Sequence, residues 1–203
     1  MRIELDCQYT TLILISGRQP VRTPAVASTF HPAMEPSSPH PDHLSLMTQA
    51  LSQAKLSPPK PTNFRVGALV VDYSTHTILA TGFTLEHPGN THAEQCCFIK
   101  LAQQHGVPEE KLAEVLPSTL ALYTTMEPCS KRLSGNLPCV ERVLRLKGCI
   151  QKVYVGVMEP KKFVSDNTGQ RRLEDAGIEV IHVQGLEEEI LKVATAGHEQ
   201  TEV

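Results

Sequence analysis

Residues 120–157 read LALYTTMEPCSKRLSGNLPCVERVLRLKGCIQKVYVGV, and the order of segments within them indicates the class of fold. The apolar run 120–124 has the composition of a buried strand, and 153–157 is a second such run. Between them, residues 140–146 have the pattern of a helix that ends at Gly148. A strand, a helix and a strand in succession are typical of a sheet covered by helices.

The segments on both sides of this stretch extend the same pattern. In chain order they are a helix over 43–54, a hairpin formed by strands 68–73 and 77–83, a helix over 92–104, a helix over 171–175, a strand over 178–182 and a helix over 187–193. We therefore expect an α/β protein, a three-layer α-β-α sandwich with a mixed five-stranded sheet. The last two strands should be parallel, because a helix between them provides the crossover that a parallel return requires.

Composition divides the chain into three parts. Residues 1–42 are rich in proline, serine and threonine and show no apolar periodicity. Such a segment buries too little apolar surface to offset the entropy of ordering it, so we expect a mostly disordered N-terminal extension. Residues 43–198 should form the folded domain, and 199–203 a short tail.

The overall composition argues against several classes of function. The 203 residues carry a net charge of −3, with no tryptophan and only 4% aromatic residues, whereas nucleic-acid-binding domains are typically basic. No apolar run approaches the ~20 residues that a membrane helix requires. Glu4 and Asp6 near the start do not fit a secretory signal, and six cysteines then indicate a reducing compartment. We therefore expect a cytoplasmic protein that binds neither nucleic acid nor membrane.

Three short motifs carry the residues of a candidate metal site. They are Thr91-His92-Ala93-Glu94 at the start of a predicted helix, Glu127-Pro128-Cys129 beyond a buried strand, and Pro138-Cys139 where the next helix begins. One histidine and two cysteines supply three ligands to a tetrahedral zinc ion and leave the fourth position for water, as catalytic zinc sites do. The sequence therefore predicts a zinc site formed by His92, Cys129 and Cys139.

The placement of these residues strengthens the prediction. His92 and Cys139 lie at two helix starts, where unpaired backbone N–H groups favour negative charge and hence a thiolate at Cys139. Tetrahedral bonds of about 2.3 Å hold two sulfurs roughly 3.8 Å apart, so the segment from Cys129 to Cys139 must close into a loop. Glu94 would lie beside the zinc water and transfer its proton. His-x-Glu with Pro-Cys is the zinc deaminase signature, although here the second cysteine follows the first by ten residues instead of three.

Simpler interpretations of the same residues remain open. Thr91 and Glu94 also fit a capping box, which requires no catalysis. Cys129 and Cys139 would be able to form a disulfide, or a structural zinc site whose fourth ligand would be Cys96, one turn after His92. The other cysteines of the domain are interpreted as small core residues: Cys96, Cys97 and Cys149.

Taken together, these motifs in this α/β order resemble the cytidine-deaminase-like superfamily over about residues 43–195. Within that superfamily, three segments resemble the riboflavin-pathway diaminopyrimidine deaminases. The sequence of residues 126–136 is most similar to the fungal enzymes. These segments are 124–130 followed by Pro138-Cys139, Asn63-Phe64-Arg65-Val66-Gly67-Ala68, and Glu159-Pro160 with Gly169 and 176–180.

The resemblance implies a complete reaction. His92, Cys129 and Cys139 would bind zinc, and zinc hydroxide would attack the ring carbon that bears the 2-amino group of 2,5-diamino-6-ribitylamino-4(3H)-pyrimidinone 5′-phosphate. Glu94 would transfer protons and release ammonia. Asn63 would hydrogen-bond the pyrimidine, since an amide both donates and accepts; on the residues alone it fits a turn before a strand equally well. The resemblance also implies a dimer or a larger assembly, and we expect a homodimer.

The chain departs from the bacterial relatives in its expected substrate contacts. Phe64 replaces a proline, Leu85 stands where they have a histidine, and His87 two residues later is more typical of a loop residue. Asn136-Leu137 replaces the Lys-Thr that meets the phosphate in those relatives. We therefore take as candidates for substrate binding Asn63, Asn90, Lys131, Arg132, Ser134 and Asn136. For the two cations, solvated surface charge is the equally simple interpretation.

Two other functions compete with this one. A deaminase of cytosine nucleosides or nucleotides would share the zinc site and Glu94, but its usual two-residue spacing between cysteines is absent. A non-catalytic, zinc-stabilised interaction module would need no acid beside the metal, so Glu94 argues against it.

Overall fold

The computed structural model describes residues 42–158 and 168–198, all within one of the two units into which the chain divides, Ser38–Val203. Except for Asp42, the predicted N-terminal extension lies outside the described residues, as do the predicted tail 199–203 and Glu159-Pro160. Asp42 caps the first helix, since its carboxylate accepts a hydrogen bond from the Ser45 amide at 3.2 Å. No helix within these described ranges is long and apolar enough to cross a membrane.

The elements follow the predicted order. They are α1 (His43–Ala54), β1 (Gly67–Asp72), β2 (Thr77–Phe83), α2 (Ala93–His105), the 3-10 helix η1 (Glu109–Glu114), β3 (Leu120–Met126), α3 (Cys139–Arg145), β4 (Ile150–Val157), α4 (Thr168–Asp175), β5 (Glu179–His182) and α5 (Glu187–Ala194). The sequence did not predict η1, because its six residues are too few to show a helical period and it buries only Leu112. Helix α4 begins three residues before its predicted start.

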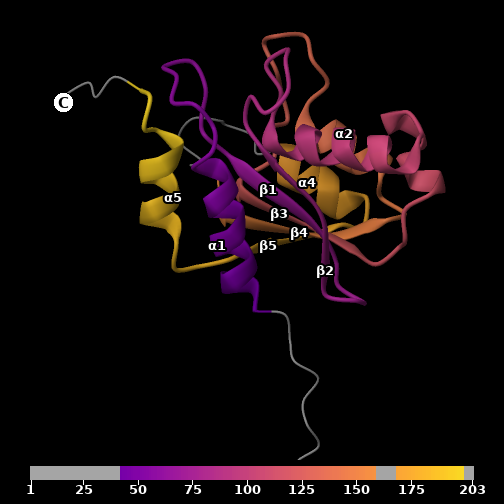
Figure 1. The fold of residues 1–203 in the computed structure, drawn as a ribbon. Helices are drawn as coiled ribbons and strands as arrows, with labels where there is room; N and C mark the ends of the chain where they lie inside the picture. The colour runs from indigo at the N-terminus through magenta and orange to yellow at the C-terminus, as the bar shows by residue number, and fades with distance from the viewer. Residues whose placement is uncertain (1–41, 159–167, 199–203) are drawn as a thin grey trace, which may run out of the picture. The chain divides into compact units, whose positions relative to one another are not determined.

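The five strands form one mixed sheet in the order β2-β1-β3-β4-β5 (Figure 1). Strand β1 pairs antiparallel with both β2 and β3, whereas β3 with β4 and β4 with β5 are parallel. The predicted mixed sheet and its parallel last pair are therefore confirmed. Both parallel pairs have a helix in the connection between their strands, as a parallel return requires.

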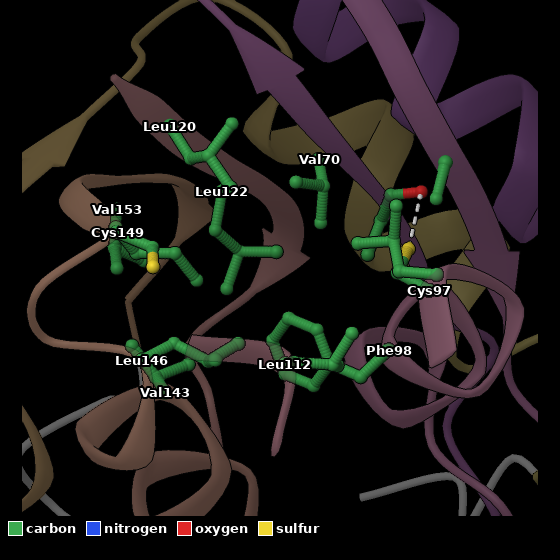
Figure 2. Packing of buried hydrophobic residues seen from close by; sticks show 14 of the residues in the cluster. Val70, Cys97, Phe98, Leu112, Leu120, Leu122, Val143, Leu146, Cys149 and Val153 are labelled. Atoms are coloured by element: carbon green, nitrogen blue, oxygen red, sulfur yellow. Dashed lines mark hydrogen bonds between the residues drawn. The ribbon is translucent and has the colours of Figure 1, made fainter. Parts of the chain in front are cut away.

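Helices cover both faces of the sheet, which confirms the three predicted layers (Figure 1). On one face, Phe98 of α2, Leu112 of η1 and Val143 of α3 pack with strand residues such as Leu122 (Figure 2). On the other face, the apolar sides of α1 and α5 pack against Tyr123 and its neighbours. Strand residues alternate between the two cores, so the central strands are buried on both sides.

Candidate metal centre and active site

The candidate site lies where β3 and β4 end and β1 begins. The Glu127 amide, just beyond β3, donates to the Val157 carbonyl at 3.0 Å, so the ends of these two parallel strands are level. The Gly67 amide at the start of β1 donates to the Thr125 hydroxyl at 3.1 Å. These contacts bring the beginnings of two helices to the same edge of the sheet, because α2 follows β2 and α3 follows the loop beyond β3.

The three predicted zinc ligands come together at this edge. Nδ1 of His92 lies 3.5 Å from Sγ of Cys129 and 3.4 Å from Sγ of Cys139. Bonds of about 2.1 Å to nitrogen and 2.3 Å to sulfur at a tetrahedral angle would separate such a pair by roughly 3.6 Å. The donor set and its spacing therefore fit a zinc ion, and the loop from Cys129 to Cys139 closes as predicted.

The alternatives to an open zinc site lose their support in the structure. Cys129 and Cys139 are free thiols, so the possible disulfide is not formed. Within the described part of the chain, the ligand cluster holds three residues and Cys96 is not one of them. The Cys96 thiol instead donates to the Phe83 carbonyl at 3.4 Å. The buried, core-like positions predicted for Cys96, Cys97 and Cys149 are confirmed.

The start of α3 favours negative charge on sulfur, but on Cys129 rather than on Cys139. The Cys139 amide, the first of the helix, donates to Sγ of Cys129 at 3.4 Å. Hydrogen bonding from the Cys139 thiol, aided by His92, lowers the pKa of Cys129 to about 4. The hydrogen bond to Cys129, which favours the proton on the Cys139 thiol, raises the pKa of Cys139 together with burial. A cation at this point would replace that proton and hold both sulfurs as thiolates.

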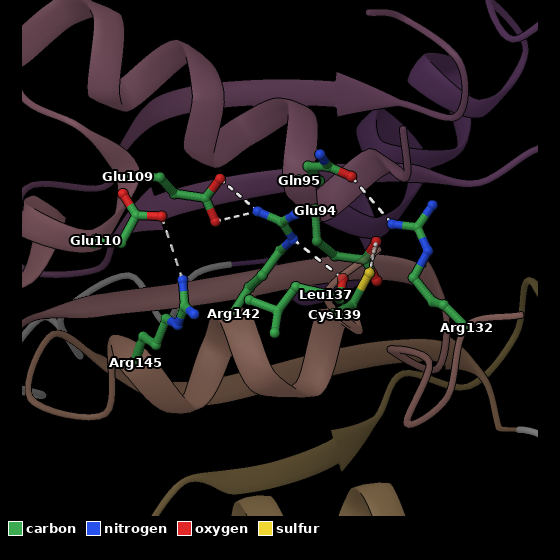
Figure 3. Close-up of polar contacts among 9 residues, drawn as sticks. All are labelled: Glu94, Gln95, Glu109, Glu110, Arg132, Leu137, Cys139, Arg142 and Arg145. Carbon is green, nitrogen blue, oxygen red and sulfur yellow. Dashed lines mark hydrogen bonds and ion pairs between the residues drawn. The ribbon is translucent and has the colours of Figure 1, made fainter. Parts of the chain in front are cut away.

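Glu94 lies beside the cluster and is almost completely buried, with 3% of its surface exposed. Its carboxylate accepts from the Cys139 thiol at 3.3 Å (Figure 3). It also accepts from the Thr124 hydroxyl at 3.3 Å. Burial raises the pKa of Glu94, although the nearby His92 opposes this. A carboxyl group with a raised pKa can accept a proton and return it, which is what a proton shuttle requires.

The capping-box interpretation of Thr91 and Glu94 is wrong. Helix α2 takes His92 as its N-cap, without a side-chain capping bond. The Thr91 hydroxyl bonds back to the loop before it, donating to the His87 carbonyl at 2.9 Å. The Glu94 side chain is therefore available to the metal cluster rather than to its own helix.

A cavity of about 620 Å³ opens beside these groups. Its lining includes His92, Glu94 and Cys129 and otherwise consists mainly of apolar and small polar side chains: Thr62, Asn63, Phe64, Val66, Thr84, Met126, Glu127, Val157 and Leu191. Asn63, predicted as a substrate contact, is in this wall. No lysine or arginine lines the cavity in the part of the chain that the structure describes.

The other predicted substrate residues lie in two loops outside the cavity wall. Arg132 donates to the Gln95 side chain at 3.1 Å (Figure 3). It also donates to the Asn90 carbonyl. The side-chain amide of Asn136 donates to the Gly89 carbonyl at 3.2 Å. The backbone amide of Asn136 donates to the Ser134 hydroxyl at 3.4 Å. Lys131 is exposed.

Sequence reasoning missed several lining residues. Met126 and Val157 are strand ends and would have been found from the rule that sites form at the carboxyl ends of parallel strands. Leu191 of α5 carries no such signal, because it reaches the cavity only through tertiary packing. Two contacts hold this C-terminal part of the chain against residues 64–65. The Arg65 amide donates to the Ala194 carbonyl at 3.0 Å, and the Phe64 ring meets the His198 ring edge to face at 4.7 Å between centroids.

A His/Cys₂ cluster with a buried glutamate and an adjacent cavity, at one edge of an α-β-α sandwich, defines the class of zinc-binding deaminase domains. The chain belongs to the family described as "Cytidine and deoxycytidylate deaminase zinc-binding region", whose profile matches residues 40–157.

The chain is also similar to a named relative and to solved structures. The Diaminohydroxyphosphoribosylamino-pyrimidine deaminase of Schizosaccharomyces pombe is 36% identical over 157 residues, or 77% of this chain, and this chain spans only 36% of that protein's length. The crystal structure of Aspergillus oryzae Rib2 deaminase (C-terminal deletion mutant) at pH 6.5 is 52% identical, with a TM-score of 0.70 over 77% of this chain and 92% of that one. Its complex with DARIPP is 51% identical, with a TM-score of 0.69 over the same shares.

Proposed function

We propose that this protein is a zinc-dependent hydrolytic deaminase of riboflavin biosynthesis that removes the 2-amino group of 2,5-diamino-6-ribitylamino-4(3H)-pyrimidinone 5′-phosphate. The observation that carries the proposal is the position of buried Glu94, 3.3 Å from a sulfur of the His92–Cys129–Cys139 cluster and in the wall of the 620 Å³ cavity. The names of the fungal relatives support the substrate class.

The chain's own residues divide the chemistry between them. His92, Cys129 and Cys139 would hold the zinc, which supplies a water molecule of lowered pKa when bound. Glu94 takes up a proton at its carboxylate and delivers it to the departing amine, so that ammonia leaves as a neutral molecule. The Asn63 amide hydrogen-bonds the edge of the pyrimidine ring. The apolar walls of the cavity, such as Val66 and Met126, exclude bulk water from the ring.

The phosphate of the substrate needs a cation beyond the cavity wall. Lys131 is our candidate, because it is exposed two residues after the proposed ligand Cys129 and its ammonium group acts as a point charge. Ser134 of the same loop would add a hydroxyl donor. Lys131→Ala should raise KM for the phosphorylated substrate and leave KM for the unphosphorylated compound unchanged. If Lys131→Ala left KM for the phosphorylated substrate at its wild-type value, Lys131 would be removed from the proposal.

We further propose that residues 43–198 act as the deaminase domain of a cytoplasmic homodimer that binds zinc and a small phosphorylated pyrimidine, and neither nucleic acid nor membrane. The five cysteines of the described residues, all free, support a reducing compartment. The net charge of −3 argues against nucleic-acid or membrane-surface binding. Light scattering of the purified protein should give twice the mass of the chain, and a monomeric mass would contradict the dimer.

Ammonia release from the purified, zinc-loaded protein tests the proposed function. We expect kcat/KM to be highest for the diaminopyrimidine phosphate with a ribityl side chain, lower with a ribosyl side chain, and lowest for cytidine. A preference for cytidine or its phosphates would instead favour the cytosine deaminase alternative. Absence of ammonia from every substrate, in protein that retains zinc, would favour the non-catalytic module.

A further inference from the structure

Two hydrogen bonds fix the side-chain amide of Asn63 at the cavity wall. Its oxygen accepts from the Thr62 hydroxyl at 2.8 Å, and its nitrogen donates to the side-chain oxygen of Asn90 at 2.7 Å. These two bonds determine which end of the amide is the donor and which is the acceptor. One N–H and one lone pair of Asn63 remain for a ligand in the cavity.

Asn90, the partner of Asn63, has an unusual backbone conformation. Its φ angle is +55°, in the left-handed region, and Gly89 before it has a φ of +92°. Asparagine tolerates this region better than most residues do, but the conformation still needs support from its surroundings. The Asn136 side chain supplies part of that support through the Gly89 carbonyl at 3.2 Å.

Arg132 also supports this turn. One arm of its guanidinium donates to the Asn90 carbonyl. Another arm donates at 3.1 Å to Gln95, three residues after the proposed zinc ligand His92 (Figure 3). Its planar, forked donors thereby connect the Asn90 turn, formed by Gly89 and Asn90 with their positive φ angles, to the first turn of α2. The guanidinium is thus directed at protein groups, and it is not in the wall of the cavity.

We infer that Arg132 and Asn90 are positioning residues, which orient the Asn63 amide for the base of the substrate and do not bind its phosphate. This inference rests on the proposed function for the identity of the substrate. The hydrogen-bond path runs from α2 through Arg132 and the Asn90 turn to Asn63. Its effect on turnover should therefore be independent of the phosphate group, because the base is what Asn63 would contact.

A matched pair of variants at position 90 isolates the side-chain bond. Asn90→Gly permits the positive φ but removes the acceptor, whereas Asn90→Asp tolerates the same φ and keeps an oxygen for Asn63. We expect Asn90→Gly to raise KM about three- to tenfold, the size of one lost hydrogen bond, with a smaller change in kcat. Asn90→Asp should stay near wild type. Equal behaviour of the two variants would overturn the role of Asn90.

Position 132 separates positioning from phosphate binding. Arg132→Ala should lower kcat/KM by the same factor for the phosphorylated substrate and for its unphosphorylated counterpart. Arg132→Lys should restore little, because an ammonium group keeps the charge but cannot reach both Asn90 and Gln95 in one plane. A loss confined to the phosphorylated substrate, or rescue by lysine, would show that Arg132 is the phosphate cation and overturn the inference.

A spectroscopic readout makes the test independent of turnover. The side-chain NH₂ resonances of Asn63 in a ¹H–¹⁵N correlation spectrum should shift in Asn90→Gly and Arg132→Ala, but not in Lys131→Ala. Unchanged resonances in the first two variants would refute the positioning path even if the protein deaminates. Conversely, shifted resonances in a protein that releases no ammonia from any substrate would leave the path intact and refute the proposed function.

Discussion

At the scale of single residues, Glu94 combines burial with close polar partners. Only 3% of the surface of the residue is exposed, yet its carboxyl group contacts the Cys139 thiol and the Thr124 hydroxyl. Removal from water raises the pKa of a carboxyl group, while hydrogen bonds to it limit that rise. An acid that only stabilised the helix start would face outward, at the end of α2. Its inward direction is what a proton shuttle beside a metal requires.

Glu94→Gln tests that role without changing the shape of the site. Glutamine has nearly the same volume but cannot accept and return a proton. We expect deamination to fall by about 10²- to 10⁴-fold, the usual contribution of a general acid–base group. Zinc content, measured by elemental analysis of the same sample, should not change. A variant that keeps more than a tenth of wild-type turnover would contradict the role of Glu94.

Residue types with specific chemistry were the most predictable part of the site. His92, Cys129 and Cys139 were recognised because few other combinations of side chains bind zinc and because two of them begin helices. The direction of the Thr91 side chain was not predictable, because a capping box and a metal site share the same residues in the same order. Leu191 was missed because an apolar side chain in an amphipathic helix carries no mark of what it faces.

At the scale of elements, close packing of β2 against α2 positions two of the functional residues. A Cβ atom at Gly82 would lie 2.3 Å from the Ala93 carbonyl oxygen and 3.0 Å from Cβ of Cys96. Only glycine allows α2 to approach the strand this closely. The beginning of α2, and with it His92 and Glu94, is therefore fixed by the absence of a side chain on β2.

Gly82→Ala should accordingly destabilise the protein and weaken zinc binding. The added methyl group meets backbone, which has to shift. We therefore expect the free energy of unfolding, measured in urea, to fall by about 1–3 kcal/mol. Gly148→Ala is the matched control: its Cβ would meet nothing within 4 Å and its φ is not left-handed. The control should stay within about 0.5 kcal/mol of wild type. Equal stability of both variants would show that the approach of α2 to β2 is not tight.

The turn between β1 and β2 depends on a charged carboxylate. Asp72 accepts from the Ser74 hydroxyl at 2.7 Å, the Thr119 hydroxyl at 2.8 Å and the Ser74 amide at 2.9 Å. The Ser74 hydroxyl is the main cause that holds the pKa of Asp72 below its ordinary value of 3.8, against the opposing effect of burial. This carboxylate is therefore more easily ionised in the folded state than in the unfolded state.

The sign of the resulting pH dependence follows from linkage. Because the pKa is lower in the folded state, ionised Asp72 adds stability above pH 3.8, and this stability is lost as the pH falls through the lowered folded value. Asp72→Asn should thus be less stable than wild type at pH 6, with a gap that narrows below pH 4. Urea unfolding at both pH values measures the gap, with Asp175→Asn at the exposed end of α4 as a control. A gap that widens in acid would contradict this assignment.

The order of the elements was predictable to a greater extent than their limits. Apolar runs and helical periods located the five strands and five α-helices of the described residues. Burial on two faces gives the central strands a continuous apolar pattern. The 3-10 helix Glu109–Glu114 was missed because one buried leucine in six residues defines no period. Antiparallel pairing of β1 with β3 is likewise a property of the sheet, and the order of elements along the chain does not specify it.

At the scale of the whole domain, the zinc ligands connect segments that the chain keeps far apart. His92 precedes α2, Cys129 follows β3 and Cys139 begins α3, so a single ion would cross-link both helix starts to the edge of the sheet. The sulfur and nitrogen atoms of these three residues lie at ligand spacing. A cation should therefore stabilise the folded state by binding it and not the unfolded chain.

Removal of zinc by a chelator should lower the melting temperature. At a free zinc concentration of 100 times Kd, binding adds about 2.7 kcal/mol, which corresponds to a shift of roughly 5–10 °C for a domain of this size. Cys139→Ser should melt near the chelated wild type and should not respond to chelator. Cys149→Ser, at a buried cysteine outside the ligand cluster, should keep the response. Chelation without effect on the wild type would argue that no ion cross-links these segments.

Elemental analysis of fractions from a sizing column, assayed in parallel for ammonia release, tests the central claim most directly. We predict about one zinc ion per chain, in constant ratio to activity across the peak, and loss of both when either sulfur ligand is replaced by serine. Full turnover in fractions that hold no transition metal would contradict the assignment of His92, Cys129, Cys139 and Glu94.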